Sequence, residues 1–231
     1  MSIKIDLEKA YDRLNWNFVE NCLVECKFLP NLINIIHHCI TSPSFKILWN
    51  GNKTEEFSPS RGIRQGDLLS LYLFVICMER LSHIFADQVE ANYWKPMRAG
   101  RSGPLISHLL FADDFLLFVE VSIEQAHCIM HCLNLFCEAS GQKINNQKTQ
   151  IFFSKNVDHQ LRDDIVQHTG YTPVISLGKY LGANIDPGKT TRGKLNHIIE
   201  KIQSRLSGWK HQCLSLAGRL TLSKSVLSSI P

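Results

Sequence analysis

Ile106-Ser-His-Leu-Leu-Phe-Ala-Asp-Asp-Phe-Leu-Leu-Phe-Val-Glu-Val121 contains two apolar runs on either side of Ala112-Asp113-Asp114. This pattern predicts a β-hairpin with acidic residues at its turn. Aspartates are common at turns for purely structural reasons. Two adjacent carboxylates in apolar surroundings nevertheless cost free energy unless a cation or hydrogen bonds offset their charge. Because Mg²⁺ prefers hard oxygen ligands, the hairpin predicts a metal site at Asp113 and Asp114.

Shorter elements are predicted ahead of this hairpin. Residues 2–7 alternate between apolar and polar side chains, which is typical of a half-buried strand, and Asp6 lies near its end. Asn15 is suited to cap the N-terminus of a helix, and Pro30 suits the first turn of a second helix that ends near residue 40. Asn50-Gly51 predicts a two-stranded hairpin over residues 44–58.

A long helix over residues 69–89 follows the polar loop Ser60-Arg-Gly-Ile-Arg-Gln-Gly-Asp67, with Asp67 as its N-cap. Its nearly continuous apolar composition predicts burial on more than one face. Ser122 and Gln125 form a capping box for the next helix, which Gly141 ends. The remaining predictions are strands at residues 149–153 and 180–185, a short helix at 158–168, and helices over 192–230 that break near Gly208 and Gly218.

Strands and helices mixed in this order predict an α+β core over residues 1–188, followed by a helical segment over residues 189–231. The helical segment has eight basic residues against one acidic residue, Glu200, so its net charge is +7. The whole chain carries +4, so the first 188 residues carry −3. A basic segment beside a slightly acidic body favours a polyanionic partner such as nucleic acid, although a solvated helix face with surplus lysines explains the charge equally well.

Composition excludes several other classes of protein. With 231 residues, of which 44% are hydrophobic, the chain is long enough to bury a core. No apolar run reaches the roughly 18 to 20 uninterrupted residues of a membrane span, so no membrane partner is expected. The first residues do not resemble a signal peptide, which predicts an intracellular location, nucleus or cytoplasm, and eight reduced cysteines.

The chain resembles reverse transcriptases of the non-LTR retrotransposon kind, particularly plant LINE-type elements. Five motifs carry the resemblance in the family's order: Lys4-Ile-Asp-Leu-Glu-Lys-Ala-Tyr-Asp12, Arg61-Gly-Ile-Arg-Gln-Gly-Asp67, Phe111-Ala-Asp-Asp114, Gly141 with Asn145 and Lys148, and Tyr180-Leu-Gly182. The resemblance implies a polymerase palm, which is an antiparallel sheet backed by helices with a ferredoxin-like core, followed by the start of a helical thumb. It also implies that the fingers region is largely missing and that the chain is a truncated fragment.

The resemblance implies RNA-directed DNA synthesis by two-metal nucleotidyl transfer. Asp6 and Asp113 would bridge two Mg²⁺ ions, with Mn²⁺ as an alternative, and Asp114 would support them. Tyr11 would exclude a 2′-hydroxyl, and Lys148 would be the general acid for the departing pyrophosphate. The loop residues Arg64, Gln65 and Gly66 would contact the incoming nucleotide and the template.

The expected partners are an RNA template, a DNA primer and dNTPs. Tyr180, Leu181 and Gly182 would grip the primer. Basic residues of the thumb would contact backbone phosphates: Lys194, Lys201, Arg205, Lys210 and Arg219. Leu68 and Leu71 stand where the family pattern has prolines, a departure that changes the freedom of the loop backbone.

Two alternatives stay open. The chain could be a non-catalytic nucleic-acid-binding remnant that uses its basic C-terminal helices. His127-Cys128 and His131-Cys132, with Cys137 after them, could hold zinc, although the apolar pattern of the same helix is explained by burial alone.

Overall fold

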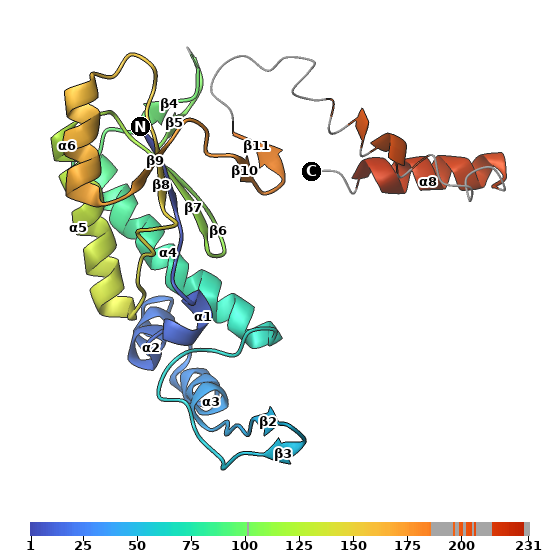
Figure 1. Ribbon diagram of the computed structural model, residues 1–231. Coiled ribbons are helices and arrows are strands. Elements are labelled where there is room, and N and C mark those ends of the chain that lie inside the picture. The colour runs from blue at the N-terminus through green and yellow to red at the C-terminus, as the bar shows by residue number, and fades with distance from the viewer. Residues whose placement is uncertain are drawn as a thin grey trace. The chain divides into compact units, whose positions relative to one another are not determined.

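The computed structural model describes residues 1–100, 102–185, 196, 199–200, 202–204, 206 and 214–228 (Figure 1). The chain divides into two compact units, Met1–Ile175 and Ser176–Pro231. The expected domain boundary between residues 188 and 189 falls outside the described residues, so it stays a prediction.

A five-stranded sheet forms the centre of the first unit. Its strands are ordered β6 (His108–Phe111), β7 (Asp114–Phe118), β1 (Ser2–Ile5), β8 (Gln150–Phe152) and β9 (Thr172–Val174). All neighbours are antiparallel except β8 and β9. The spatial order β8-β1-β7-β6, with helices between β1 and β6 and between β7 and β8, is that of a ferredoxin-like core. The α+β architecture is therefore confirmed.

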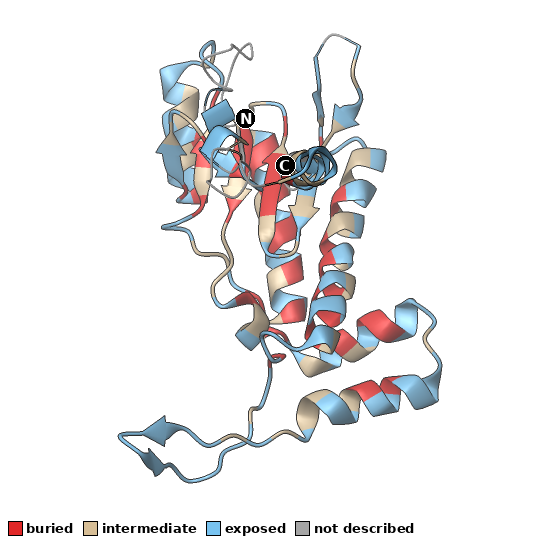
Figure 2. Ribbon diagram, turned by 90° about the vertical axis from the view of Figure 1, so that its right-hand side faces the viewer, coloured by how far each residue is buried: buried red, intermediate tan, exposed pale blue. Residues whose placement is uncertain are grey.

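Helices cover one face of this sheet (Figure 1). They are α4 (Leu68–Glu90) and α5 (Ile123–Ser140); α2 (Trp16–Glu25) packs against both of these helices, and α6 (His159–Thr169) packs against α5. The alternate residues Ile3, Ile5, Phe115, Leu117 and Ile151 join them in the core and are almost completely buried. Figure 2 shows this buried layer between the sheet and the inner faces of the helices.

The predicted helix ends are confirmed. The side chains of Asn15, Asp67 and Ser122 each accept a hydrogen bond from a backbone amide in the first turn of their helix. Gly141, at φ 77°, ends α5 in the left-handed conformation. The capping box of α5 is only half formed, because the Gln125 amide binds the backbone of Tyr93 and Lys95 instead of Ser122.

The remaining elements are short apart from two helices. Asn50 and Gly51 both have positive φ and form the expected hairpin turn, but the ladder has only two residues on each side. The first unit also contains α1 (Ala10–Arg13), α3 (Pro30–Thr41), β2 (Leu48–Trp49), β3 (Asn52–Lys53), β4 (Met97–Arg98) and β5 (Leu105–Ile106). The second unit contains β10 (Lys179–Tyr180), β11 (Ala183–Asn184) and α8 (Leu216–Ser228).

Two predictions about helices are wrong. Helix α8 runs through Gly218 without a break, since a single glycine weakens a helix but does not end it. Helix α4 buries one stripe instead of several faces: Leu73, Phe74, Cys77, Met78, Leu81 and Phe85 are buried, whereas Leu68, Leu71, Tyr72 and Val75 are exposed. By length and composition alone α4 could cross a membrane, a test that helices of protein cores also pass.

Burial of His108 predicts that the stability of the fold depends on pH. Its ring lies within hydrogen-bonding distance of the Ser82 hydroxyl (Nε2 to Oγ, 2.7 Å) and the Ser107 hydroxyl (Nδ1 to Oγ, 2.9 Å), and burial lowers the pKa of His108. The unfolded chain therefore binds more protons than the folded chain at this residue once the pH falls below about 6.5. Stability should fall as the pH drops from 7.5 to 5.5.

Urea unfolding at the two pH values measures this effect. The His108→Gln variant should lose part of the pH dependence, whereas the same change at His83, which is exposed on α4, should not. Equal pH dependence in all three proteins would contradict the assignment to His108.

Candidate active site

The carboxylates lie at one end of neighbouring strands β1 and β7. The antiparallel register pairs Ile5 with Phe115, so Asp6 and Asp114 are the next residues at this end of the two strands. Phe111 pairs with Asp114 across the β6–β7 hairpin, which leaves Ala112 and Asp113 as a two-residue turn. Ala112 has φ 52°, a left-handed conformation that costs a non-glycine residue about 1–2 kcal/mol. The turn leaves Asp113 exposed beside the half-buried Asp6 and Asp114.

The backbone around Asp6 is held by the segment that precedes β8. The Asp6 amide donates to the Thr149 hydroxyl (3.2 Å), and the Asn145 amide donates to the Asp6 carbonyl (2.8 Å). Thr149 is completely buried and was not singled out by the sequence, which indicated only that a strand begins there. The same turn carries Lys148, whose amide bonds to Asn145 and whose side chain is exposed.

A cavity of about 530 Å³ brings together four of the residues singled out by sequence: Tyr11, Gln65, Gly66 and Asp113. The Tyr11 ring stacks on Phe74 of α4, with 4.6 Å between ring centroids and 13° between ring planes. Burial, and then the negative charge of Asp113, raise the pKa of the Tyr11 phenol. Three of the sequence motifs, at residues 4–12, 61–67 and 111–114, therefore meet at one cavity.

The loop that supplies Gln65 is anchored to the chain around α1. The Gly62 amide donates to the Leu14 carbonyl (2.7 Å), and the Ile63 amide donates to the Tyr11 carbonyl (2.9 Å). The Trp16 indole donates to the Gly62 carbonyl (2.7 Å). These bonds hold one wall of the cavity in register with Tyr11, a role for Trp16 and Gly62 that the sequence did not indicate.

Gly62→Ala should destabilise the protein by about 2 kcal/mol, because a Cβ at this φ of +88° is strained and would lie 2.6 Å from the Asp12 carbonyl oxygen. Gly66→Ala is the matched control, because Gly66 has a similar φ of +90° but no atom within 4 Å of the added Cβ. It should cost only the backbone strain, about 1 kcal/mol. Denaturant unfolding measures both, and equal losses would contradict close packing at Gly62.

Other singled-out residues lie apart from this cavity. Arg64 lines a neighbouring cavity. Tyr180, Leu181 and Gly182 belong to the β10–β11 hairpin of the second unit, where Leu181 and Gly182 form the turn with φ 50° and 86°. Arg219 is exposed on α8. Lys194, Lys201, Arg205 and Lys210 lie outside the described residues.

A metal site needs several donor side chains close together. Among the described residues, no group of three or more His, Cys, Asp or Glu side chains is placed to hold a metal ion. This holds for the helix considered for zinc, where Cys132 is buried in the core and the His127 ring lies against His168 (3.9 Å between centroids). Asp6, Asp113 and Asp114 fit Mg²⁺ by the chemistry of their oxygen donors, because Mg²⁺ takes one or two carboxylates and completes its shell with water and substrate phosphates.

Known proteins that resemble this chain include reverse transcriptases and proteins of transposable elements. A family model described as reverse transcriptase (RNA-dependent DNA polymerase) matches residues 1–185. The chain is 26% identical over 144 residues to a retrovirus-related Pol polyprotein from the type-2 retrotransposable element R2DM of Drosophila melanogaster, covering 62% of this chain and 13% of that protein. It is 25% identical over 237 residues to the transposon TX1 uncharacterized 149 kDa protein of Xenopus laevis, and the match covers 99% of this chain and 17% of that protein.

Among solved structures, telomerase from Candida tropicalis in complex with a fragment of telomeric RNA has a TM-score of 0.58 at 15% identity. The match covers 98% of this chain and 37% of that one, and at this identity it shows the fold alone. The chain spans about half or less of the length of the curated relatives that it matches.

The ferredoxin-like sheet and its helical cover define an α+β fold that this chain shares with the telomerase structure. Because the family model matches most of its length, the chain belongs to the reverse transcriptase (RNA-dependent DNA polymerase) family. The non-LTR kind that the motifs resemble fits its two relatives from transposable elements.

Proposed function

We propose that this domain catalyses RNA-directed DNA synthesis, adding dNTPs to the 3′-hydroxyl of a DNA primer on an RNA template. The observation that carries the proposal is the cavity lined by Tyr11, Gln65, Gly66 and Asp113. A polymerase needs a carboxylate, a contact with the sugar and a close backbone approach in one place, and these residues supply all three. The cavity size is within the range of about 300–1,000 Å³ that is usual for small-molecule sites.

Asp6 and Asp113 would hold two Mg²⁺ ions, with Asp114 in support, and Mn²⁺ is expected to substitute. When bound, these ions supply charge stabilisation to the phosphoryl oxygens and lower the pKa of the primer hydroxyl. The chain keeps the Asp6 backbone in place through Thr149 and Asn145, and it fixes Asp113 at a tight turn. Such fixed positions avoid reorganisation when the reaction occurs.

Tyr11 and the Gly62–Gly66 loop would position the nucleotide. The Tyr11 ring, supported by its stack on Phe74, would lie against the sugar and exclude a 2′-hydroxyl. Gly66 has positive φ and no side chain, so the backbone can approach the ligand closely. Lys148 is exposed on the turn beside Asp6, within the part of the chain that would face the departing pyrophosphate.

Residues of the second unit would contact the template and primer. Tyr180, Leu181 and Gly182 would grip the primer end. Arg219, exposed on α8, would contact backbone phosphates together with Lys194, Lys201, Arg205 and Lys210. Such contacts are independent of sequence and weaken with salt.

Primer extension on an RNA template with dNTPs and Mg²⁺ tests the proposal. Extension beyond the primer supports the enzyme. If extension is absent while salt-sensitive binding persists and is lost on deleting residues 189–231, the chain is a nucleic-acid-binding module. Absence of both extension and binding would contradict every role proposed for the chain.

A further inference from the structure

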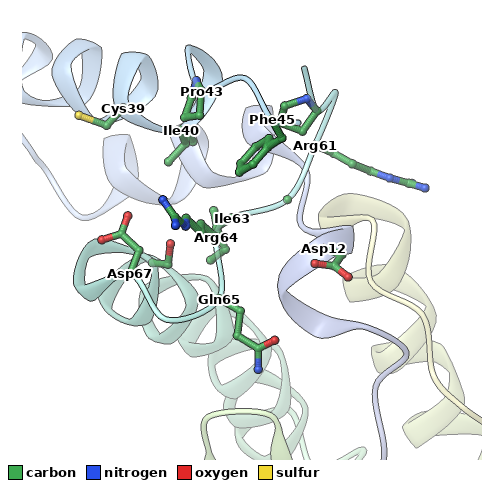
Figure 3. A pocket seen from close by; sticks show the side chains of 13 residues that line it. Asp12, Cys39, Ile40, Pro43, Phe45, Arg61, Ile63, Arg64, Gln65 and Asp67 are labelled. Carbon is green, nitrogen blue, oxygen red and sulfur yellow. The ribbon is translucent and has the colours of Figure 1, made fainter. Parts of the chain in front are cut away.

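The short helix α1 carries Tyr11 but cannot fix its own position. It has only four residues, and isolated helices of this length are unstable in water. Among the described side chains none caps its first turn, and Lys9 before it has a left-handed φ of 48°. Figure 3 shows Asp12 of α1 beside the neighbouring cavity of about 450 Å³, and Asp12 and Tyr11 also line the first cavity. Because α1 borders open space on this side, contacts from other parts of the chain must hold Tyr11 in place.

The segment that follows α5 lies along α1 and holds both of its ends. Ahead of α1, the Glu8 amide donates to the Lys143 carbonyl (2.8 Å). Behind α1, the Asn15 amide donates to the Ser140 carbonyl (2.8 Å). Residues 140–143 and 8–15 therefore run side by side in opposite directions.

Gln142 contacts the stretch between these two ends. Its Nε2 atom donates to the carbonyl of Ala10, the residue directly before Tyr11 (2.7 Å). Gln142 is 3% exposed and Ala10 is 8% exposed, so water does not compete for this bond. Because Ala10 offers an acceptor, the amide nitrogen of Gln142 must face it. The Oε1 atom on the other side of the amide is buried and has no hydrogen-bond partner among the described residues.

Packing alone does not explain a glutamine at this position. A buried acceptor without a partner costs free energy that an apolar side chain of similar size, such as methionine, would avoid. The bond to the Ala10 carbonyl offsets this cost and acts one residue away from Tyr11.

We propose that Gln142 is a positioning residue for sugar selection. By fixing the Ala10 carbonyl, it sets where the Tyr11 ring lies against the sugar of the incoming nucleotide, while the stack on Phe74 supports the ring itself. The inference rests on the proposed function, which assigns the sugar contact to Tyr11. Gln142 does not touch the nucleotide and acts only through the backbone of α1.

The ratio of kcat/KM for dTTP and UTP on one RNA template tests the inference. Gln142→Met keeps the volume of the side chain but loses the donor, so it should lower the preference for dTTP by about three- to tenfold. The change should be a higher kcat/KM for UTP, with the value for dTTP unchanged within about twofold. A general loss of folded protein would instead lower both values together.

Gln125→Met is the matched control. Gln125 is buried like Gln142, and its Nε2 atom also donates to a backbone carbonyl at 2.7 Å. That carbonyl belongs to Tyr93, which is not among the residues that line the cavity. The control variant loses the same kind of bond and should keep the normal ratio.

The place of Tyr11 can also be measured without turnover. In chain labelled with fluorotyrosine, the fluorine NMR resonance of Tyr11 is identified by its absence from the Tyr11→Phe variant. This resonance should shift in Gln142→Met and keep its position in Gln125→Met.

The outcomes separate this inference from the proposed function. If the normal chain extends no primer, the proposed function fails and sugar selection fails with it, whatever the fluorine spectrum shows. If the normal chain extends primers but Gln142→Met keeps the normal ratio, the role of Gln142 is overturned while the proposed function stands. An equal loss of preference in Gln125→Met, or an unmoved Tyr11 resonance in Gln142→Met, would overturn it as well.

Discussion

Asp113→Asn should slow primer extension by about a thousandfold. Asp113 lines the cavity beside Tyr11, and an amide keeps its size but loses the charge that would hold a metal ion. Metal ions supply several kcal/mol of charge stabilisation to phosphoryl transfer, and each 1.36 kcal/mol is a factor of ten in rate. Asparagine also tolerates turn geometry, so the β6–β7 hairpin should remain folded.

Single-turnover extension with excess enzyme measures this loss. Asp163→Asn is the matched control, since Asp163 is exposed on α6 and does not belong to the end of β1 or to the β6–β7 turn, which carry Asp6 and Asp113. It should extend primers at the normal rate. A rate for Asp113→Asn within threefold of normal would mean that this carboxylate does not take part in the chemistry.

Tyr11→Ala should reduce the preference for dNTPs over rNTPs by about ten- to hundredfold. In the proposed geometry the ring leaves no room for a 2′-hydroxyl, and such overpacking costs about 1–3 kcal/mol, which the alanine would relieve. The Tyr11→Phe variant keeps the ring and should keep the preference. The measured quantity is the ratio of kcat/KM for dTTP and UTP on one RNA template.

This ratio is insensitive to partial unfolding. Alanine also removes the stack on Phe74, so part of a preparation could be inactive, but dTTP and UTP are tested on the same active molecules. If Tyr11→Ala kept the normal ratio while still extending primers, Tyr11 would be an ordinary buried aromatic residue.

The sequence predicted the local elements of the fold well because their signals are short-range. Asn15, Asp67 and Ser122 cap helices through bonds to amides two or three residues away, and Asn50-Gly51 sets its own turn. The apolar runs around Asp113 likewise specified the β6–β7 hairpin. These features need no knowledge of the distant chain.

The sequence could not predict contacts that depend on distant segments. Thr149 receives the Asp6 amide across 143 positions, and the Trp16 indole reaches Gly62 across 46. Composition alone also misled the prediction for α4, because apolar residues such as Leu68 and Tyr72 are exposed on one side of a helix that is buried along the other. The family motifs indicated which residues matter at the cavity, and the fold shows which of them meet.

The most direct test of the roles of Asp6 and Asp113 is to count the Mn²⁺ ions that the chain binds. Bound Mn²⁺ is measured as the decrease of the EPR signal of free Mn²⁺ in the presence of dTTP and template–primer. Two Mn²⁺ ions per normal chain are expected, with at least one lost in both Asp6→Asn and Asp113→Asn and none lost in Asp163→Asn. If the Asp6 and Asp113 variants bound as many Mn²⁺ ions as the normal chain, these carboxylates would not be the metal site.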